Sequence, residues 1–482
     1  MTAEAAIDPP PGRHAGWREL VAEGRGAVLA LILLGCWVVA ADSLVTATIM
    51  PSVGAALDGY AWFGWAGSSF MTGLVVAGAS AGWLAERIGL RAAMTLSGTV
   101  FALGCGLSAA APDIGLFLAG RALQGGAAGW IGGLIYVALA LRFDGRHLPR
   151  VFALCTSVWG IATFAGPLLG GLFADAGIWR GVFWLFAGQA LLFTAASFLL
   201  IPHAQGKNES GRLPWATMLL VALGTSAVAT AGVVAGGRLS ALLAAGGGAL
   251  LISALVADRA GANGLLPRGE RGFPLDAAYL VYFATNAAAA AFALYAPALL
   301  QFSAGLSALE AGYLVAVEAL AWTAASLGAS GAPERWRGRL IVAGAGAILA
   351  GTFGVTLLMD SGSLLAIGVA AALLGGGFGL AYPFLGQRVI GSFGDATRAR
   401  GSAAIGAVRN AGGAVGAALA GLAANAAGFG EGLSASNFSL VAWAAFGIGI
   451  PFALAALIAA VRVVRPGREA QAGLASGMSA AA

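Results

Sequence analysis

Four ionisable side chains lie inside long apolar stretches of the sequence, where a charge is costly and usually has a function. They are Asp42, Arg121, Glu318 and Arg409. Asp42 lies about 24 Å from the start of its stretch, and Arg121 lies at a similar depth in another stretch. Burial favours the neutral carboxyl group, whereas a nearby arginine favours the ionised one, so this pair predicts a site that binds and releases protons. The alternative is a fixed ion pair that only holds two helices together.

Glu318 lies about 15 Å into its apolar stretch, near the middle of a membrane. Substrate sites of transporters built from repeats lie at this depth, so we expect Glu318 to bind protons or attract cations in a central cavity. Glu310 lies on nearly the same helix face, and the alternative is that both carboxylates line a water-filled vestibule. Other polar side chains could form hydrogen bonds inside the cavity or equally between helices; these are Gln124, Tyr282, Asn286 and Tyr295.

Enzyme chemistry has little support in this sequence. The histidines, His14, His147 and His203, all lie in polar segments, so the usual imidazole sites for acid–base or metal chemistry are absent. The three cysteines fall inside apolar runs and lack metal-binding spacing. The sequence has no Gly-x-x-x-x-Gly-Lys-Ser/Thr motif for nucleotide phosphates. We therefore expect no catalytic site, no cofactor and no metal.

Fourteen apolar segments carry the polar residues described above, and each approaches the length of about 20 residues that crosses a bilayer. The chain is 59% hydrophobic and only 10% charged, against about 25% charged in soluble domains. We therefore expect an all-α membrane protein with 14 transmembrane helices. The segments are Gly26–Met50, Ala61–Leu84, Ala92–Ala110, Ile114–Leu141, Val151–Ala174, Gly181–Ile201, Trp215–Ala235, Leu239–Ala257, Leu275–Leu300, Ala308–Ala329, Leu340–Met359, Leu364–Gly386, Gly401–Ala424 and Leu440–Val461.

Basic residues concentrate in alternate connections between these segments. If both termini are cytoplasmic, 22 of the 26 lysines and arginines lie on the cytoplasmic side, as the positive-inside rule requires. We therefore predict cytoplasmic tails over 1–25 and 462–482 in a multi-pass protein of the cell inner (plasma) membrane. The formal charge of +5 does not indicate nucleic-acid binding, because the arginines are dispersed at helix ends and form no continuous face.

Two parts of the chain repeat each other at an offset of 246 residues. The repeat is clearest where Ala165–Gly171 corresponds to Ala411–Ala417. It predicts two parallel six-helix halves, over 26–201 and 275–461, with an inserted two-helix hairpin over 215–257. Parallel halves that hold a substrate at their interface are a recurrent plan of membrane transporters.

Five motifs occur in a consistent order along the segments. The connection Gly82–Arg91 is similar to a Gly-x-Leu-Ala-Asp-Arg-x-Gly-Arg-Arg/Lys pattern, with glutamate in place of aspartate and leucine in place of one arginine. The other four motifs are Asp42–Pro51, Arg121–Gly126, Gly160 with Gly166–Gly171, and Arg409–Gly416. Together the motifs resemble those of the major facilitator superfamily, and within it the branch of 14-span drug:proton antiporters.

This resemblance implies a function and roles for particular residues. In that family the proline–glycine motif accompanies exporters, which implies proton-coupled efflux of hydrophobic or amphipathic small molecules by alternating access. An alternative on the same fold is the export or uptake of a lipid, a siderophore or a metabolite. We expect a monomer in the lipid bilayer whose partners are its substrate and protons. The residues expected to gate the conformational change are Gly82, Glu86, Arg87, Gly89, Arg91, Gly166, Pro167, Gly170, Gly171, Arg409, Gly412 and Gly413.

Overall fold

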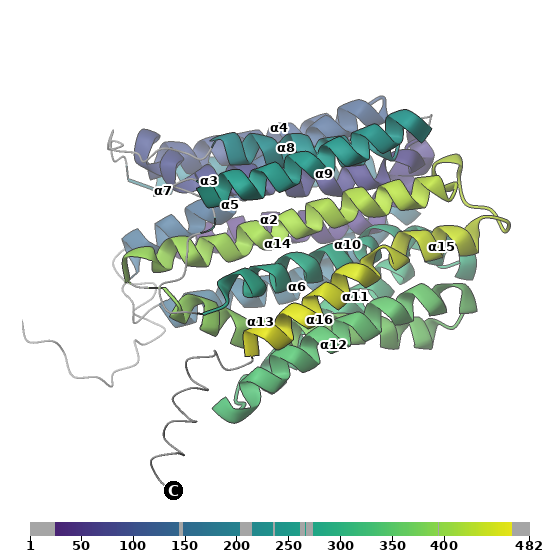
Figure 1. Ribbon diagram of the computed structural model, residues 1–482. Coiled ribbons are helices and arrows are strands. Elements are labelled where there is room, and N and C mark those ends of the chain that lie inside the picture. The colour runs from purple at the N-terminus through teal and green to yellow at the C-terminus, as the bar shows by residue number, and fades with distance from the viewer. Residues whose placement is uncertain are drawn as a thin grey trace, which may run out of the picture.

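The protein is a bundle of long helices that run side by side (Figure 1). The computed structural model describes residues 25–143, 148–202, 215–234, 237–260, 266, 273–393 and 395–464. The α-helices in this part are α2 (Arg25–Ala56), α3 (Phe63–Ile88), α4 (Leu90–Ala110), α5 (Ile114–Arg142), α6 (Leu148–Asp175), α7 (Arg180–Leu200), α8 (Trp215–Ala231), α9 (Gly237–Ala260), α10 (Leu275–Ala304), α11 (Ala308–Ala329), α12 (Glu334–Leu358), α13 (Leu364–Gly391), α14 (Asp395–Ala426), α15 (Phe438–Gly447) and α16 (Gly449–Val464). Three short 3₁₀ helices join them: η1 (Tyr60–Trp62), η2 (Met359–Ser361) and η3 (Phe429–Glu431).

Many of the described helices are suited to a membrane. Eleven spans are long and apolar enough to cross one, or twelve if the bent pair Tyr60–Gly78 and Ser80–Ile88 forms a single span. In that count α15 and α16 form one span, α8 is too short at 17 residues, and α14 is not included. Each of the fourteen predicted segments overlaps a helix or the α15–α16 pair. The number of fourteen spans stays a prediction.

Helix packing repeats between the first and second parts of the chain. In the first part α2 packs on α6, α3 on α5, and α4 on both α5 and α7. In the second part α10 packs on α14, α11 on α13, and α12 on both α13 and α16. These two sets of six helices meet along two seams, one between α3 and α14 and the other between α6 and α11. The 246-residue offset relates α3 to α11 and α6 to α14. It therefore converts the α3–α14 seam into the α6–α11 seam, as expected for two parallel six-helix halves.

The helix α8 lies against the first of these seams. It packs on α9, on α3 and on α14, so it touches both halves. The hydroxyl groups of Thr72 in α3 and Thr225 in α8 lie 2.9 Å apart. Asn425 of α14 donates hydrogen bonds from Nδ2 to the carbonyl oxygen of Gly232, at 2.9 Å, and to that of Ala61. Asn425 thereby links α14 both to the residues after α8 and to η1, which precedes α3.

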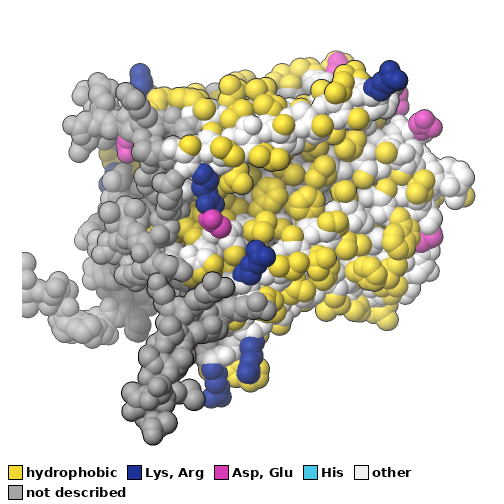
Figure 2. All heavy atoms as spheres, viewed as in Figure 1, with side chains coloured by type: hydrophobic (Ala, Val, Ile, Leu, Met, Phe, Trp, Pro, Cys, Tyr) yellow, Lys and Arg dark blue, Asp and Glu magenta, His cyan; other side chains and the backbone are white. Residues whose placement is uncertain are grey.

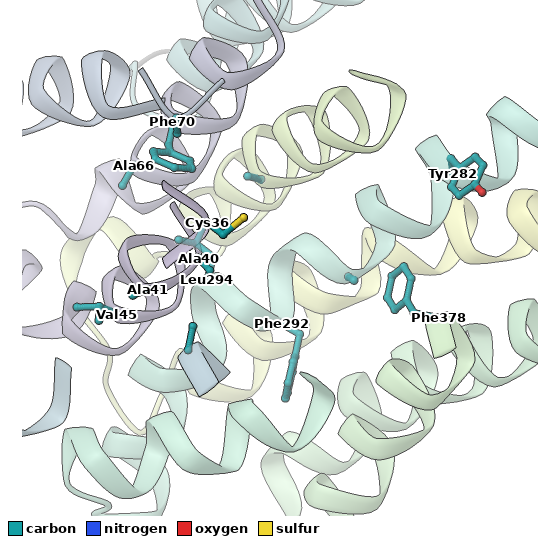
Figure 3. Packing of buried hydrophobic residues seen from close by; sticks show 14 of the residues in the cluster. Cys36, Ala40, Ala41, Val45, Ala66, Phe70, Tyr282, Phe292, Leu294 and Phe378 are labelled. Atoms are coloured by element: carbon teal, nitrogen blue, oxygen red, sulfur yellow. The ribbon is translucent and has the colours of Figure 1, made fainter. Parts of the chain in front are cut away.

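The surface and the interior are both largely apolar. Figure 2 shows that apolar side chains dominate the visible face and that charged ones are sparse. Leu199 is 76% exposed and Leu365 is 80% exposed, as expected for side chains that contact lipid. The core is continuous across the two halves, and Figure 3 shows part of it with labelled side chains from α2, α3, α10 and α13.

The two ends of the bundle differ in charge. We call the end at which α2 begins the arginine end, because it carries Arg25, Arg87, Arg142, Arg388 and Arg462 at helix termini. The other end, called the far end, carries the connections from α2 to α3 and from α10 to α11. The assignment of the arginine end to the cytoplasm stays a prediction.

Candidate functional site

A cavity of about 220 Å³ lies between the two halves. This volume is smaller than the roughly 300–1,000 Å³ of sites for drug-sized ligands, so a molecule of that size requires further opening. Most of the wall is apolar, and Phe70, Leu294 and Phe378 of this wall are labelled in Figure 3. The polar lining residues include Ser43 and Thr46 of α2, Arg121 of α5, Asn286 of α10 and Glu318 of α11.

Arg121 forms a buried ion pair with Asp42, as the depths of the two residues predict. The Nη1 atom of Arg121 lies 2.9 Å from Oδ2 of Asp42, and the two residues are 2% and 1% exposed. Nη1 also donates to Oε1 of Gln124, whose Nε2 lies 3.1 Å from the hydroxyl of Ser108. The guanidinium group lies 4.4 Å from the ring centroid of Phe70. Arg121 is therefore held on three sides, while one face of it reaches the cavity.

The Asp42 carboxylate retains one oxygen without a hydrogen bond. Its Oδ1 is buried and has no partner among the described residues. The neighbouring residues Ser43 and Thr46 line the cavity, and the hydroxyl of Thr46 donates to the backbone carbonyl of Asp42 at 2.8 Å. A proton bound at Oδ1 would leave the hydrogen bond between Oδ2 and Arg121 in place, which makes Oδ1 the atom best suited to protonation.

Glu318 and Glu310 have different surroundings, although they lie on one helix. Glu318 is partly buried, lines the cavity, and forms no ion pair within the described part of the chain. A side chain at Gly375 of α13 would overlap the backbone carbonyl of Glu318, so this turn of α11 is fixed by close helix packing. Glu310 instead forms a capping box with Ser307 at the start of α11, with Oε2 accepting from the Ser307 amide at 2.9 Å. Glu310 does not line the cavity with Glu318.

An aromatic cluster covers the cavity wall next to Glu318. Trp322 lies one turn further along α11 and stacks on Phe378 with ring centroids 4.9 Å apart. The guanidinium group of Arg409 lies 5.4 Å from the ring of Trp322 and 5.1 Å from the ring of Tyr382. The hydroxyl of Tyr382 accepts from Nδ2 of Asn286 at 2.6 Å. Trp322, Phe378 and Tyr382 were not predicted from the sequence, because aromatic residues carry little signal in an apolar chain.

Three of the four expected polar cavity residues do not line the cavity. Gln124 is turned toward Arg121, and Tyr282 packs edge-on against Tyr382 with centroids 4.8 Å apart. Tyr295 is fully buried at the far end and lies 5.0 Å from Phe429, measured between ring centroids. Only Asn286 of this set faces the cavity.

The proline–glycine motif of α6 packs on both α2 and α11. A Cβ atom on Gly166 would lie 2.6 Å from the Cβ of Leu44, and one on Gly171 would lie 2.5 Å from the Cα of Leu309. Gly170 leaves similarly little space against α2, and Pro167 lies inside α6 close to α11. The motif therefore lies at the α6–α11 seam, where the two halves meet and where gating residues are expected. Its gating role stays a prediction.

The corresponding motif of α14 packs on α10. Side chains at Gly412 and Gly416 would overlap the backbone carbonyls of Phe283 and Ala287. Gly413, between them, faces the cavity. Two glycines of the motif therefore pack against α10, and Gly413 faces the cavity where a substrate would lie.

The motif between α3 and α4 forms a tight connection at the arginine end. Gly89 alone joins the two helices, and its φ of +83° is accessible to glycine at little cost. Arg91 lies 4.0 Å from the ring centroid of Phe198 in α7, and Arg87 lies 5.3 Å from that of Trp83. The Arg91 contact ties the start of α4 to the end of α7, whereas the Arg87 contact lies within α3.

The other two residues of this motif make few contacts. Glu86 is exposed and forms no ion pair within the described residues, and the Cβ position of Gly82 has no neighbour within 4 Å. In the second half, Arg337 donates to Oε1 of Gln387 at 3.4 Å. The gating role expected for Glu86 and Gly82 stays a prediction.

The two halves are joined closely at the far end. Phe63 of α3, Tyr295 of α10 and Phe429 of η3 pack with ring centroids 5.0–6.0 Å apart. Beside them α3 and α14 touch, because a Cβ atom on Gly64 would lie 2.7 Å from the Cα of Gly421. These contacts hold the two halves together at the far end.

Comparisons with known proteins agree with this arrangement. The sequence profile of the Major Facilitator Superfamily matches residues 32–417. A probable multidrug-efflux transporter of Mycobacterium tuberculosis is 30% identical over 393 residues, which cover 78% of this chain and 82% of that protein. A crystallised transporter of the POT family, in complex with 5-aminolevulinic acid, superposes with a TM-score of 0.66 at 13% identity over 94% of this chain and 99% of that one. The nucleoside transporter NupG gives a TM-score of 0.62 at 13% identity over 91% and 100%.

Proposed function

The chain belongs to the major facilitator superfamily of secondary transporters, and on this premise we propose that it exports hydrophobic or amphipathic small molecules in exchange for protons. The family consists of transporters and not of enzymes. The finer assignment is to the branch of 14-span drug:proton antiporters, acting as a monomer in the plasma membrane by alternating access. Both termini and the arginine end would then be cytoplasmic.

One observation carries this proposal: a mostly apolar cavity between the halves contains a carboxylate, Glu318, that has no ion-pair partner among the residues that the structure describes. The aromatic rings of Phe70, Trp322 and Phe378 offer dispersion contacts to a flat or greasy molecule. Glu318 would attract a cationic group on such a molecule, or would hold a proton in its place. A strictly polar substrate would find few partners here, because most of this wall cannot form hydrogen bonds.

Asp42 and Arg121 are the proposed coupling pair. Protonation of Asp42 would remove the charge that balances Arg121, and a buried arginine without a counter-ion is unfavourable. The two halves could relieve this cost by moving so that Arg121 reaches water or an anionic partner. Proton binding at Asp42 would in this way favour one access state over the other, as proton-driven exchange requires.

Export is favoured over uptake by two observations. The similar proteins of Mycobacterium tuberculosis are described as probable multidrug-efflux transporters, and the match covers most of both chains. The α6 motif, which accompanies exporters in the branch that the sequence resembles, packs tightly at the α6–α11 seam. The closed far end would then be the exit side. The gating residues of α3, α6 and α14 would act by repacking at these contacts.

The test is transport in proteoliposomes with an imposed pH gradient. One proton exchanged per substrate can drive about tenfold accumulation per pH unit, because one unit is worth about 1.4 kcal/mol. The protein should show this accumulation for lipophilic cations or neutral drugs, and Asp42→Asn should abolish it while downhill exchange continues. Asp113→Asn is the matched control, since Asp113 only caps the start of α5 and asparagine caps equally well.

Two results would contradict the proposal. Gradient-driven accumulation by Asp42→Asn would show that protons are coupled elsewhere. Accumulation of a lipid, a siderophore or a metabolite, with none of the lipophilic drugs moved, would favour the alternative substrates on the same fold.

A further inference from the structure

A second, larger hollow lies at the arginine end. It has a volume of about 750 Å³, is formed by α9, α10 and α16, and shares no lining residue with the cavity between the halves. We call it the α9–α16 groove. Its charged lining residues are Arg259 in the last turn of α9, Asp276 in the first turn of α10 and Arg462 in the last turn of α16. All three charges therefore lie at the same level, at the mouth of the groove.

The walls become apolar away from this mouth. Leu280 lies one turn deeper than Asp276 on α10, and Ile458 lies one turn deeper than Arg462 on α16. One turn corresponds to about 5–6 Å along a helix. The groove is thus polar at the helix ends and apolar toward the middle of the bundle. A phospholipid has the same order of parts, with the charged head at the membrane surface and the acyl chains inside.

The charges at the mouth favour an anion. Arg259 and Asp276 form an ion pair, with Nη2 and Oδ1 2.6 Å apart. Arg462 is exposed and forms no ion pair within the described part of the chain. Asp258, which is buried next to Arg259 and accepts a hydrogen bond from the amide of the lining residue Leu266, adds a second negative charge, so the positive charge of the mouth is concentrated on the exposed Arg462. A guanidinium group binds the oxygens of a phosphate with two parallel hydrogen bonds.

We propose that the α9–α16 groove binds an anionic phospholipid. Its phosphate lies on Arg462, its head group lies beside the Arg259–Asp276 pair, and an acyl chain follows Leu280 and Ile458 inward. A soluble phosphate would use the mouth but not the apolar walls, so the lipid fits more of the groove. Basic pockets between membrane helices on the cytoplasmic side are known to hold such head groups. The lipid joins α9 to α10 and α16, whereas the protein joins α9 mainly to α8.

Native mass spectrometry of the purified full-length protein tests this proposal. The protein is incubated with equal amounts of phosphatidylglycerol and phosphatidylcholine that carry the same acyl chains. We expect preferential retention of phosphatidylglycerol, reduced about fivefold by Arg462→Gln, because one arginine near a lipid head contributes that factor. Arg142→Gln is the matched control, since Arg142 is exposed in the last turn of α5 at the same end but outside the groove. It should retain both lipids as the unmodified protein does.

A second variant tests the apolar wall of the groove without changing any charge. Ile458 is 49% exposed, so Ile458→Trp fills the groove with little demand on the fold and should lower retention of phosphatidylglycerol with all charges intact. Glycerol phosphate, added as a soluble competitor, should not displace the lipid at equal concentration. Equal retention of the two lipids, equal loss in Arg142→Gln, no loss in Ile458→Trp, or displacement by glycerol phosphate would each overturn the proposal. Gel filtration and thermal unfolding establish that each variant is folded before it is compared.

Discussion

Replacement of Glu318 by glutamine tests whether this carboxylate selects cations. The substitution keeps the size and the hydrogen-bonding capacity of the side chain and removes its charge. A hydrogen bond to a charged group contributes about 1.5–3 kcal/mol, which corresponds to about 10- to 150-fold in affinity. The lower end of this range applies if water fills the cavity, because water screens the charge. Since Glu318 is partly buried beside Trp322 and Phe378, we expect a loss of at least about tenfold for a lipophilic cation and less than about twofold for a neutral molecule of similar shape.

The assay is equilibrium binding to purified protein, by calorimetry or fluorescence, with one cationic and one neutral aromatic ligand. Glu310→Gln is the matched control, because it is the same substitution on the same helix but outside the cavity. Glu310 forms a capping box with Ser307, and glutamine can form the same capping box. This variant should bind both ligands normally. Equal loss of the two ligands in Glu318→Gln, or no loss of either, would refute the reasoning and leave Glu318 a structural residue.

Two further substitutions address the ion pair and the closed end. Arg121→Ala leaves the buried Asp42 carboxylate unpaired and should lower the free energy of unfolding by about 3–5 kcal/mol, seen as a lower Tm than that of the unmodified protein; an unchanged Tm would contradict this. Gly171→Leu places a side chain where Leu309 lies, so α6 and α11 must separate at the far end. In a background without the native cysteines, a Leu309→Cys variant should then react faster with an impermeant maleimide. An unchanged labelling rate would count against a gating role.

The charged residues inside apolar segments were predicted best from the sequence. Asp42 and Arg121 are far apart in the chain, yet their equal depth predicted the ion pair that the structure contains. The superfamily was identified from motif order and is confirmed by the profile match. Buried charge has few acceptable solutions in a membrane, which is why its position is informative.

Aromatic and amide side chains were assigned less well. On α10, Tyr282, Asn286 and Tyr295 all lie in an apolar run that is buried on nearly every side, so periodicity does not show which face meets the cavity. Only Asn286 faces it, while Tyr295 packs at the far end. Trp322 was missed for the same reason, because its neighbours on α11 are equally apolar.

The different roles of Glu310 and Glu318 became clear only in the structure, although the sequence contained a signal for one of them. Eight residues place the two carboxylates on nearly the same side of a helix, and the sequence allowed both to line one vestibule. Glu310 is instead the third residue after Ser307, and this spacing is a capping box. The Ser-x-x-Glu pattern was readable in the sequence and would have separated the two roles.

The position of α8 makes the two seams of the bundle mechanically unequal. Opening the α3–α14 seam at the far end requires loss of the hydrogen bond from Asn425 to Ala61 and separation of Gly64 from Gly421. It also requires that α8 leave one of the two halves, with loss of either the Asn425–Gly232 hydrogen bond or the Thr72–Thr225 contact. The α6–α11 seam has no such third helix packed along it among the described elements. An unreinforced pair of halves would rock about an axis midway between the seams. With a brace on one side, we expect the axis to shift toward α8, so that the α3–α14 side acts as the hinge and the α6–α11 side swings through the wider arc.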